Sequence, residues 1–264
     1  MDREHFLVQE LMPNGTLKDY LHDRAAIRIA YGLGRNAVQF KHPDAHFDWP
    51  LRCRFLEDIC SAMGFLHSRA SPMIHRDLKP ANCLLDSNYR VKVADFGTVK
   101  WKLRLRRQST RKGRKRTGCS KSRLSTKQPD AAGDFEDDDV AEETEPVGTP
   151  LYMAPECFKK TMKPGLKVDV WSFSFVVFEI CCREKPFEGV RFFMSKIESG
   201  KRPTDFMTGT LDAVPQVLQD LMVQCWQKEP ALRPLFRNGP GETGATVADQ
   251  LLAAASTLRG TTSV

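Results

Sequence analysis

Four polar side chains in the first half of the chain have the types and spacing that phosphoryl transfer requires. Asp77, Lys79 and Asn82 fall within one run, HRDLKPAN, and Asp95 opens the tripeptide DFG thirteen residues after Asn82. Phosphoryl transfer needs a carboxylate to take the proton of the attacking hydroxyl, a cation beside the transferred group, and oxygen ligands for magnesium. Together the four side chains provide these groups.

The same two strings resemble the catalytic loop, HRDLKPxN, and the metal-binding loop, DFG, of the protein kinase superfamily. The resemblance implies that Asp77 is the catalytic base and that Lys79 contacts the γ-phosphate of ATP. It also implies that Asn82 and Asp95 are the ligands of Mg²⁺. ATP and Mg²⁺ are therefore the expected nucleotide and metal, and a protein is the expected substrate.

The resemblance also implies where the adenine base would bind. Leu84, two residues after Asn82, corresponds to a floor beneath the base. Glu10 and Met12 resemble the hinge, whose backbone pairs with adenine, beside a gatekeeper at Gln9. The expected ATP-binding residues are thus Glu10, Met12 and Leu84, with Lys79 at the phosphates.

Further strings follow in the order that the family shows. Residues 148–156, GTPLYMAPE, resemble the end of an activation segment, and residues 169–173, DVWSF, resemble the start of the central helix of the large lobe. The family then implies an ion pair between Glu156 and Arg233. Any one of these tripeptides is a weak signal, but five motifs in one order predict the kinase fold.

The choice of acceptor hydroxyl is also indicated by resemblance. Lys79 stands where Ser/Thr kinases have lysine and tyrosine kinases do not, and Thr149 suits the same choice. The strings CW at 225–226 and RPLF at 233–236 look most like the tyrosine-kinase-like group. We therefore expect a serine/threonine-protein kinase of signal transduction. His75 and Phe96 are expected to pack in the core.

Local patterns predict the elements that hold these residues. Asp48 is a helix cap followed by an apolar stripe from Leu51 to Leu66. Thr16 and Asp19 form a capping box that opens a short helix through Leu21. Two short strands, 83–85 and 91–94, are separated by a turn at 86–88. Further helices are predicted over 168–182, 190–199, 214–227 and 245–258.

The expected fold class is α+β, with the protein-kinase-like fold: a mainly helical C-terminal lobe with a hinge and short β-hairpins. The N-terminal lobe is expected to be largely missing from this sequence, because no Gly-rich loop, strand lysine or helix glutamate precedes His5. We predict a partial kinase domain over 1–258 and a tail over 259–264. Its predicted parts are the last small-lobe strand and hinge (1–14), the large lobe with the catalytic and DFG loops (15–100), an activation-segment insert (101–145), and the rest of the large lobe (146–258), with a loop insertion at 24–47.

The late start of the motif series leaves two explanations open. The chain is a piece of a longer active kinase, or it is a pseudokinase-like scaffold that binds proteins through the large lobe, including Val190 to Ser199. The intact catalytic residues favour the first. In both cases apolar surface around the hinge is expected to face water, and the isolated chain is expected to be poorly stable.

The predicted insert carries two opposite charge blocks. Residues 101–127 contain twelve Lys or Arg and no acid, and residues 130–145 contain nine Asp or Glu and no base. This composition predicts disorder. Three roles stay open: a solvated loop, a regulatory segment on which an upstream kinase places a phosphate that Arg76 receives, or two charge blocks that pair with each other and shield the substrate groove. The tract 111–116 suits nuclear import or polyanion binding, although nucleic acid is not an expected partner.

Composition excludes some classes of protein. The chain has 264 residues, 41% hydrophobic and 28% charged, and a formal net charge of +7 that the basic block explains. The longest apolar stretch, Val170 to Cys182, is shorter than the roughly 20 residues that span a bilayer, so no membrane insertion is expected. The start of the chain lacks the order of a secretory signal, and the eight cysteines form no Cys-x-x-Cys pair. The expected location is cytoplasmic or nuclear.

Overall fold

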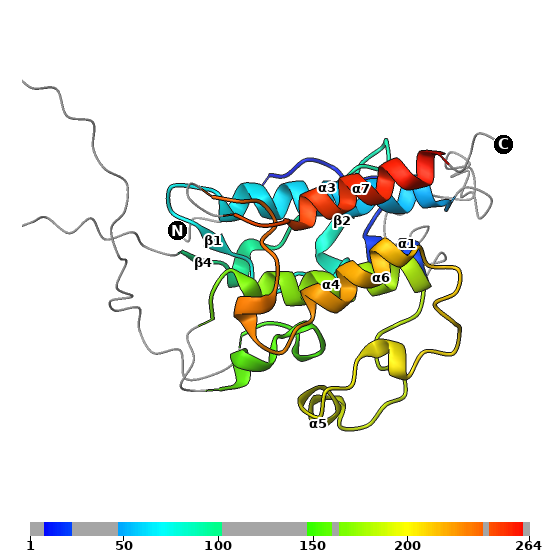
Figure 1. The fold of residues 1–264 in the computed structure, drawn as a ribbon. Helices are drawn as coiled ribbons and strands as arrows, with labels where there is room; N and C mark the ends of the chain where they lie inside the picture. The colour runs from blue at the N-terminus through cyan, green and yellow to red at the C-terminus, as the bar shows by residue number, and fades with distance from the viewer. Residues whose placement is uncertain (1–7, 23–46, 102–146, 160–163, 240–242, 261–264) are drawn as a thin grey trace, which may run out of the picture.

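The structure is a computed structural model, and it describes residues 8–22, 47–101, 147–159, 164–239 and 243–260 (Figure 1). Some sequence predictions therefore lie outside the described residues. These are the apolar run before Val8, most of the loop insertion at 24–47, the charged insert after Trp101, and the last four residues of the tail.

The described part is mainly helical, with short antiparallel strands. The α-helices are α1 (Leu17–His22), α3 (Trp49–His67), α4 (Lys167–Cys182), α5 (Phe193–Glu198), α6 (Gln216–Cys225) and α7 (Val247–Gly260). The strands are β1 (Met73–Ile74), β2 (Cys83–Leu85), β3 (Val91–Val93) and β4 (Lys100–Trp101). Short 3-10 helices are η2 (Pro80–Asn82), η3 (Phe96–Thr98), η4 (Pro150–Tyr152), η5 (Pro155–Phe158), η6 (Pro203–Asp205) and η7 (Pro230–Leu232).

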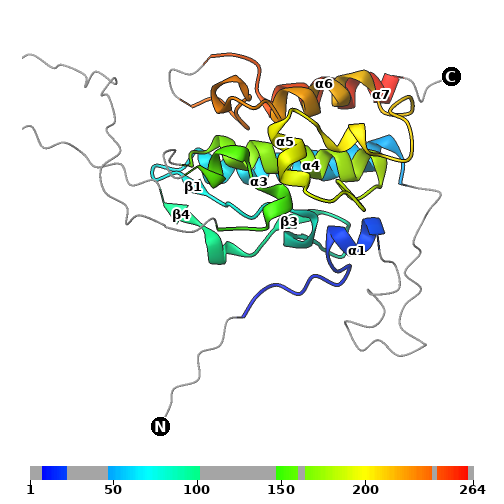
Figure 2. The ribbon, with the colours of Figure 1, turned by 90° about the horizontal axis from the view of Figure 1, so that it is seen from below.

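The helices form layers around α4. In Figure 2, α3 and α4 run through the middle, α6 and α7 cover one side, and α1 and the short strands lie on the other. Helix α4 is mainly apolar and is buried over nearly its whole length, and its buried polar residues include Asp169 and Glu179. Among the described residues, no helix combines the length and the apolar character needed to cross a membrane.

The N-terminal caps of two helices confirm the sequence prediction. Asp48 accepts a hydrogen bond from the Leu51 amide at 3.0 Å, which satisfies one of the free amides that begin α3. Thr16 Oγ1 accepts from the Asp19 amide at 3.1 Å, and Asp19 accepts from the Thr16 hydroxyl at 2.7 Å. This capping box fixes the start of α1, directly after the hinge segment.

The hairpin that carries Leu84 forms as predicted, although its second strand ends one residue early. Strands β2 and β3 pair antiparallel, with Leu84 opposite Lys92. Asp58 on α3 holds the hairpin by accepting hydrogen bonds from the Val91 amide at 2.9 Å and from the Arg90 guanidinium. The pairing of β1 with β4 has no counterpart in the sequence predictions, because two-residue strands carry no periodic signal.

Two regions differ from expectation in detail. Helix α5 starts at Phe193 rather than 190, because Phe192 adopts a left-handed backbone conformation with φ 56°. Helices α6 and α7 begin two residues later than predicted. Of the predicted strand before the hinge, the structure describes only Val8, which lies in no strand and is 92% exposed.

Candidate active site

A buried carboxylate of α4 holds the loop that contains Asp77 through hydrogen bonds to its backbone. Asp169 is fully buried and accepts hydrogen bonds from the backbone amides of His75 and Arg76, each at 2.9 Å. His67 Nε2 on α3 lies 2.8 Å from the same carboxylate. Arg76 has φ 67°, an uncommon conformation for a residue with a side chain, so its backbone is held in a sparsely populated region.

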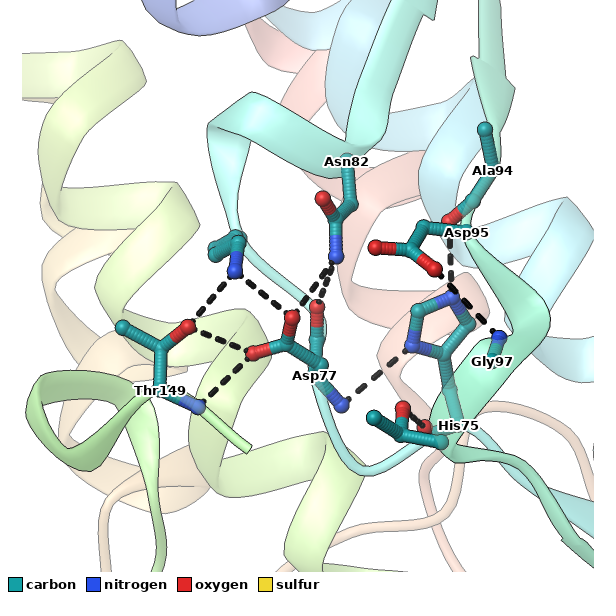
Figure 3. A network of polar contacts seen from close by, with 9 residues as sticks. His75, Asp77, Asn82, Ala94, Asp95, Gly97 and Thr149 are labelled. Carbon is teal, nitrogen blue, oxygen red and sulfur yellow. Dashed lines mark hydrogen bonds and ion pairs between the residues drawn. The ribbon is translucent and has the colours of Figure 1, made fainter. Parts of the chain in front are cut away.

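The carboxylate of Asp77 is the centre of a polar network (Figure 3). Lys79 Nζ donates to Oδ2 at 2.6 Å, and Thr149 donates to Oδ1 through its amide at 2.8 Å and through its hydroxyl at 2.7 Å. Lys79 Nζ also donates to Thr149 Oγ1 at 2.6 Å, which closes a triangle of the three side chains. The predicted residues Asp77 and Lys79 are therefore brought together.

This environment sets the charge of Asp77. Burial alone would raise the pKa of its carboxyl group, but the hydrogen bonds from Lys79 and Thr149 outweigh burial and hold the pKa below its ordinary value. Asp77 is consequently an anion at neutral pH. The anionic form of a carboxyl group is the form that can accept a proton from a hydroxyl.

Asn82 belongs to the same network, and Asp95 lies next to it (Figure 3). Asn82 Nδ2 donates to the Asp77 carbonyl oxygen at 2.8 Å and to its Oδ2 at 3.0 Å. Because the amide nitrogen is used in this way, Asn82 turns its oxygen away from Asp77 (Figure 3). The Ala94 amide donates to the Asn82 carbonyl oxygen at 2.8 Å, which keeps Asp95 beside Asn82.

The donor set of Asn82 and Asp95 fits Mg²⁺. Both offer oxygen atoms, the ligands that this hard cation prefers, and the Asp95 side chain is exposed. Asp95 has φ 64° and accepts from the Gly97 amide at 3.3 Å, so a strained turn presents its carboxylate. Within the described ranges, no group of three or more His, Cys, Asp or Glu could hold a metal ion.

The predicted adenine contacts are placed as follows. Leu84 is half-buried in the centre of β2 and forms an antiparallel bridge with Thr16, at the end of the hinge segment. Met12 is buried and its carbonyl oxygen accepts from the Gly15 amide at 3.2 Å, whereas Glu10 is exposed. The structure thus brings Leu84 beside the segment that follows the hinge, and pairing of Glu10 and Met12 with a base stays a prediction.

The two aromatic residues expected in the core behave differently. His75 is fully buried, with Nε2 3.0 Å from the Ala94 carbonyl oxygen and Nδ1 3.3 Å from the Asp77 amide, so it packs as predicted. Phe96 is 49% exposed, and the core prediction for it is wrong. Its ring centroid lies 5.5 Å from that of His75.

The contacts of Thr149, Gly148 and Asp169 were not predicted from the sequence. The sequence pattern relates Thr149 only to a class of substrate, yet Thr149 bonds both Asp77 and Lys79. Asp169 holds the loop that contains Asp77. Gly148 has φ 122°, and a Cβ added there would lie 2.5 Å from the Arg76 carbonyl oxygen, so only glycine fits. The only available signal for Gly148 and Thr149 was the Gly-Thr-Pro string itself.

The predicted ion pair between Glu156 and Arg233 is confirmed. Arg233 donates to the two Glu156 oxygens at 2.5 and 2.9 Å, and both side chains are buried. This bidentate contact ties η5 to the segment before α7. It holds the end of the 148–156 string against the helical core.

Comparison with known proteins gives a consistent family. Residues 1–239 match the model of the protein kinase domain family. Ankyrin repeat and protein kinase domain-containing protein 1 of Mus musculus is 34% identical over 200 residues, covering 74% of this chain and 23% of that protein. Receptor-interacting serine/threonine-protein kinase 2 of Bos taurus is 30% identical over 237 residues, covering 87% and 35%. Receptor-interacting serine/threonine-protein kinase 4 of Homo sapiens is 33% identical over 213 residues, covering 78% and 21%. The chain thus spans about a fifth to a third of the length of these relatives.

Proposed function

Since the chain belongs to the protein kinase family, with likeness to its tyrosine-kinase-like group, we propose that it transfers the γ-phosphoryl group of ATP to serine or threonine hydroxyls of proteins. The family as a whole uses ATP and a divalent metal, and Mg²⁺ is the metal we propose. The observation that carries the proposal is the anionic Asp77 bonded to both Lys79 and Thr149.

The residues of the site have separable roles. Asp77 orients the acceptor hydroxyl and takes its proton. Lys79 places a positive charge beside the transferred group, where negative charge accumulates in the transition state. Asn82 and Asp95 would hold Mg²⁺, which when bound neutralises charge on the phosphates. Thr149 keeps Asp77 and Lys79 in register through three hydrogen bonds.

The choice of serine or threonine rests on the family resemblance that Lys79 and Thr149 carry. Lys79 donates to Oδ2 of Asp77 and Thr149 donates to Oδ1, so both residues contact the proposed base. The names of two of the relatives, which describe serine/threonine kinases, agree with this proposal.

The test is identification of the phosphorylated residue. The full chain is incubated with γ-labelled ATP, Mg²⁺ and a general protein acceptor, and the labelled product is hydrolysed to amino acids. We expect phosphoserine or phosphothreonine, and loss of labelling when a chelator removes the metal. Labelling of tyrosine alone would overturn the acceptor class, and absence of ATP binding would favour the scaffold reading, in which the large lobe acts by protein binding.

Regulation and location are proposed on the sequence alone. We propose an upstream kinase that acts on the activation segment, and a cytoplasmic or nuclear location. The segment that would receive the phosphate lies outside the described residues. Mass-spectrometric mapping of phosphosites in the cellular protein tests the first proposal.

A further inference from the structure

A buried carboxylate of α4, separate from the residues assigned above, joins two distant parts of the chain. Glu179 is 2% exposed, and each of its carboxylate oxygens has a partner. The Tyr152 hydroxyl donates to Oε1 at 2.7 Å, and His22 Nε2 lies 2.7 Å from Oε2. Because two acceptors would repel each other, the contact requires a proton on His22 Nε2, so both partners donate to Glu179.

Tyr152 connects Glu179 to the candidate active site through further hydrogen bonds. Tyr152 is the last residue of η4, the 3-10 helix that begins directly after Thr149. Its amide donates to the Thr149 carbonyl oxygen at 2.9 Å. Its own carbonyl oxygen accepts from the Ser172 hydroxyl of α4 at 2.8 Å. Thr149 in turn gives its amide and its hydroxyl to Asp77. A continuous series of hydrogen bonds therefore leads from Glu179 to the proposed base.

The other end of the series is α1, the short helix after the hinge segment. Figure 2 shows α1 beside one end of α4. His22, the last residue of α1, lies within hydrogen-bond distance of Glu179 of α4. The side chains of His22 and Glu179 are 7% and 2% exposed, so their contact is shielded from solvent. Hydrogen bonds to an ionised group in such surroundings are stronger than those between neutral groups.

The Tyr152 hydroxyl is held in its donor form by the same surroundings. Burial and the neighbouring Glu179 carboxylate both raise the pKa of Tyr152, so its hydroxyl keeps its proton at neutral pH. Removal of either donor would leave a buried carboxylate short of a hydrogen bond, which is costly in a protein interior. The position of Tyr152 is thereby tied to the presence of both partners.

We propose that Glu179 and His22 are positioning residues for phosphoryl transfer: they fix the segment 149–152 against Asp77, so that an acceptor hydroxyl meets the base in register. This inference rests on the proposed function, because register matters to catalysis only if Asp77 acts as the base. Both residues act through Tyr152, which makes them positioning rather than catalytic residues.

The test compares matched variants of the full chain. His22→Leu removes the donor to Glu179, whereas His22→Gln keeps an N–H group in its place. Tyr152→Phe removes the hydroxyl, and Tyr89→Phe is the control, because the Tyr89 hydroxyl makes no hydrogen bond within the described residues. The first readout is hydrogen exchange of the amides in the peptide 149–152, followed by mass spectrometry.

We expect His22→Leu and Tyr152→Phe to speed exchange in this peptide by about tenfold, the factor that matches loss of one hydrogen bond to a charged group. His22→Gln and Tyr89→Phe should leave it unchanged. The second readout is kinetic. His22→Leu should lower kcat with a protein acceptor by about tenfold, leave the KM for ATP unchanged, and be rescued by His22→Gln.

The two readouts separate this inference from the proposed function. Unchanged exchange at 149–152 in His22→Leu overturns the inference whether or not the chain transfers phosphate, as does an equal rise in exchange over all helices. If exchange responds as expected but the unaltered chain transfers no phosphate, the hydrogen-bond series stands and the proposed function fails. A rise in the KM for ATP alone, with kcat unchanged, contradicts a positioning role.

Discussion

At the scale of the residue, the chemistry depends on how one carboxylate is surrounded. Asp77 is buried, which opposes its charge, yet Lys79 and Thr149 supply hydrogen bonds that restore it. A base of this kind is anionic and oriented before any substrate arrives. The same contacts explain why Thr149 belongs to the site although it lies 72 residues from Asp77 in the sequence.

The lowered pKa of Asp77 predicts a pH dependence. A carboxyl group with a depressed pKa stabilises the fold above its unfolded value of about 3.9, and this contribution is lost as pH falls through the lower folded value. The lowered pKa also keeps Asp77 in the anionic form that a base requires. Titration of Asp77 should therefore cause no loss of kcat/KM between about pH 8 and pH 5. Thr149→Val, which removes one hydrogen bond to Asp77, should move the acid limb of the profile to higher pH.

Thr149→Ser keeps the hydroxyl and serves as the control for this prediction. Its acid limb should coincide with that of the unaltered chain. Identical acid limbs in Thr149→Val and Thr149→Ser would show that the Thr149 hydroxyl does not set the pKa of Asp77.

Gly148 gives a second prediction at this scale. Gly148→Ala places a Cβ 2.5 Å from the Arg76 carbonyl oxygen, at a φ of 122° that side chains rarely adopt. We expect a loss of about 1–3 kcal/mol in the free energy of unfolding, measured by urea denaturation, together with a fall in transfer rate. Gly165→Ala is the control, because nothing lies within 4 Å of its added Cβ. Equal effects of the two substitutions would count against a close approach at Gly148.

At the scale of the element, the sequence predicts what local signals determine. Helix α3 could be predicted because Asp48 caps it and an apolar stripe follows, and the β2–β3 hairpin because a turn separates two apolar runs. The pairing of β1 with β4 could not, since two-residue strands gain their partners from tertiary packing. The link from Glu179 to Tyr152 and His22 escaped for the same reason: three separate elements meet only in the folded chain.

The ion pair of Glu156 and Arg233 supports a prediction about elements. Arg233 is fully buried, so Glu156→Ala leaves a buried guanidinium without its carboxylate and loosens η5 from the core. Breaking such a pair should cost about 3–5 kcal/mol in the free energy of unfolding, measured by chemical denaturation. Lys201→Ala, which removes an exposed pair with Asp205 at 3.1 Å, is the control and should change stability by less than about 1 kcal/mol. Comparable losses in both variants would contradict the assignment.

At the scale of the whole molecule, the described residues form the helical lobe that carries the catalytic loop. Val8, Leu11 and Phe96 are 92%, 71% and 49% exposed, on the predicted hinge segment and the DFG loop. This agrees with the expectation from the sequence that apolar surface near the hinge faces water. The family resemblance predicted the α+β fold and the positions of Asp77, Lys79, Asn82 and Asp95, while the exposure of Phe96 depends on which elements cover it and could not be read from its tripeptide.

The most direct test of the account compares the full chain with Asp77→Asn in transfer of label from γ-labelled ATP to a protein acceptor, with Mg²⁺ present. Thermal stabilisation by ATP and Mg²⁺ is measured on both proteins, so that nucleotide binding is known to be equal. We predict that Asp77→Asn lowers the transfer rate by about 10²- to 10⁴-fold, the usual contribution of a general base, without changing the stabilisation. Equal transfer rates for the two proteins, or no transfer by an unaltered chain that binds the nucleotide, would contradict the assignment of Asp77 as the base.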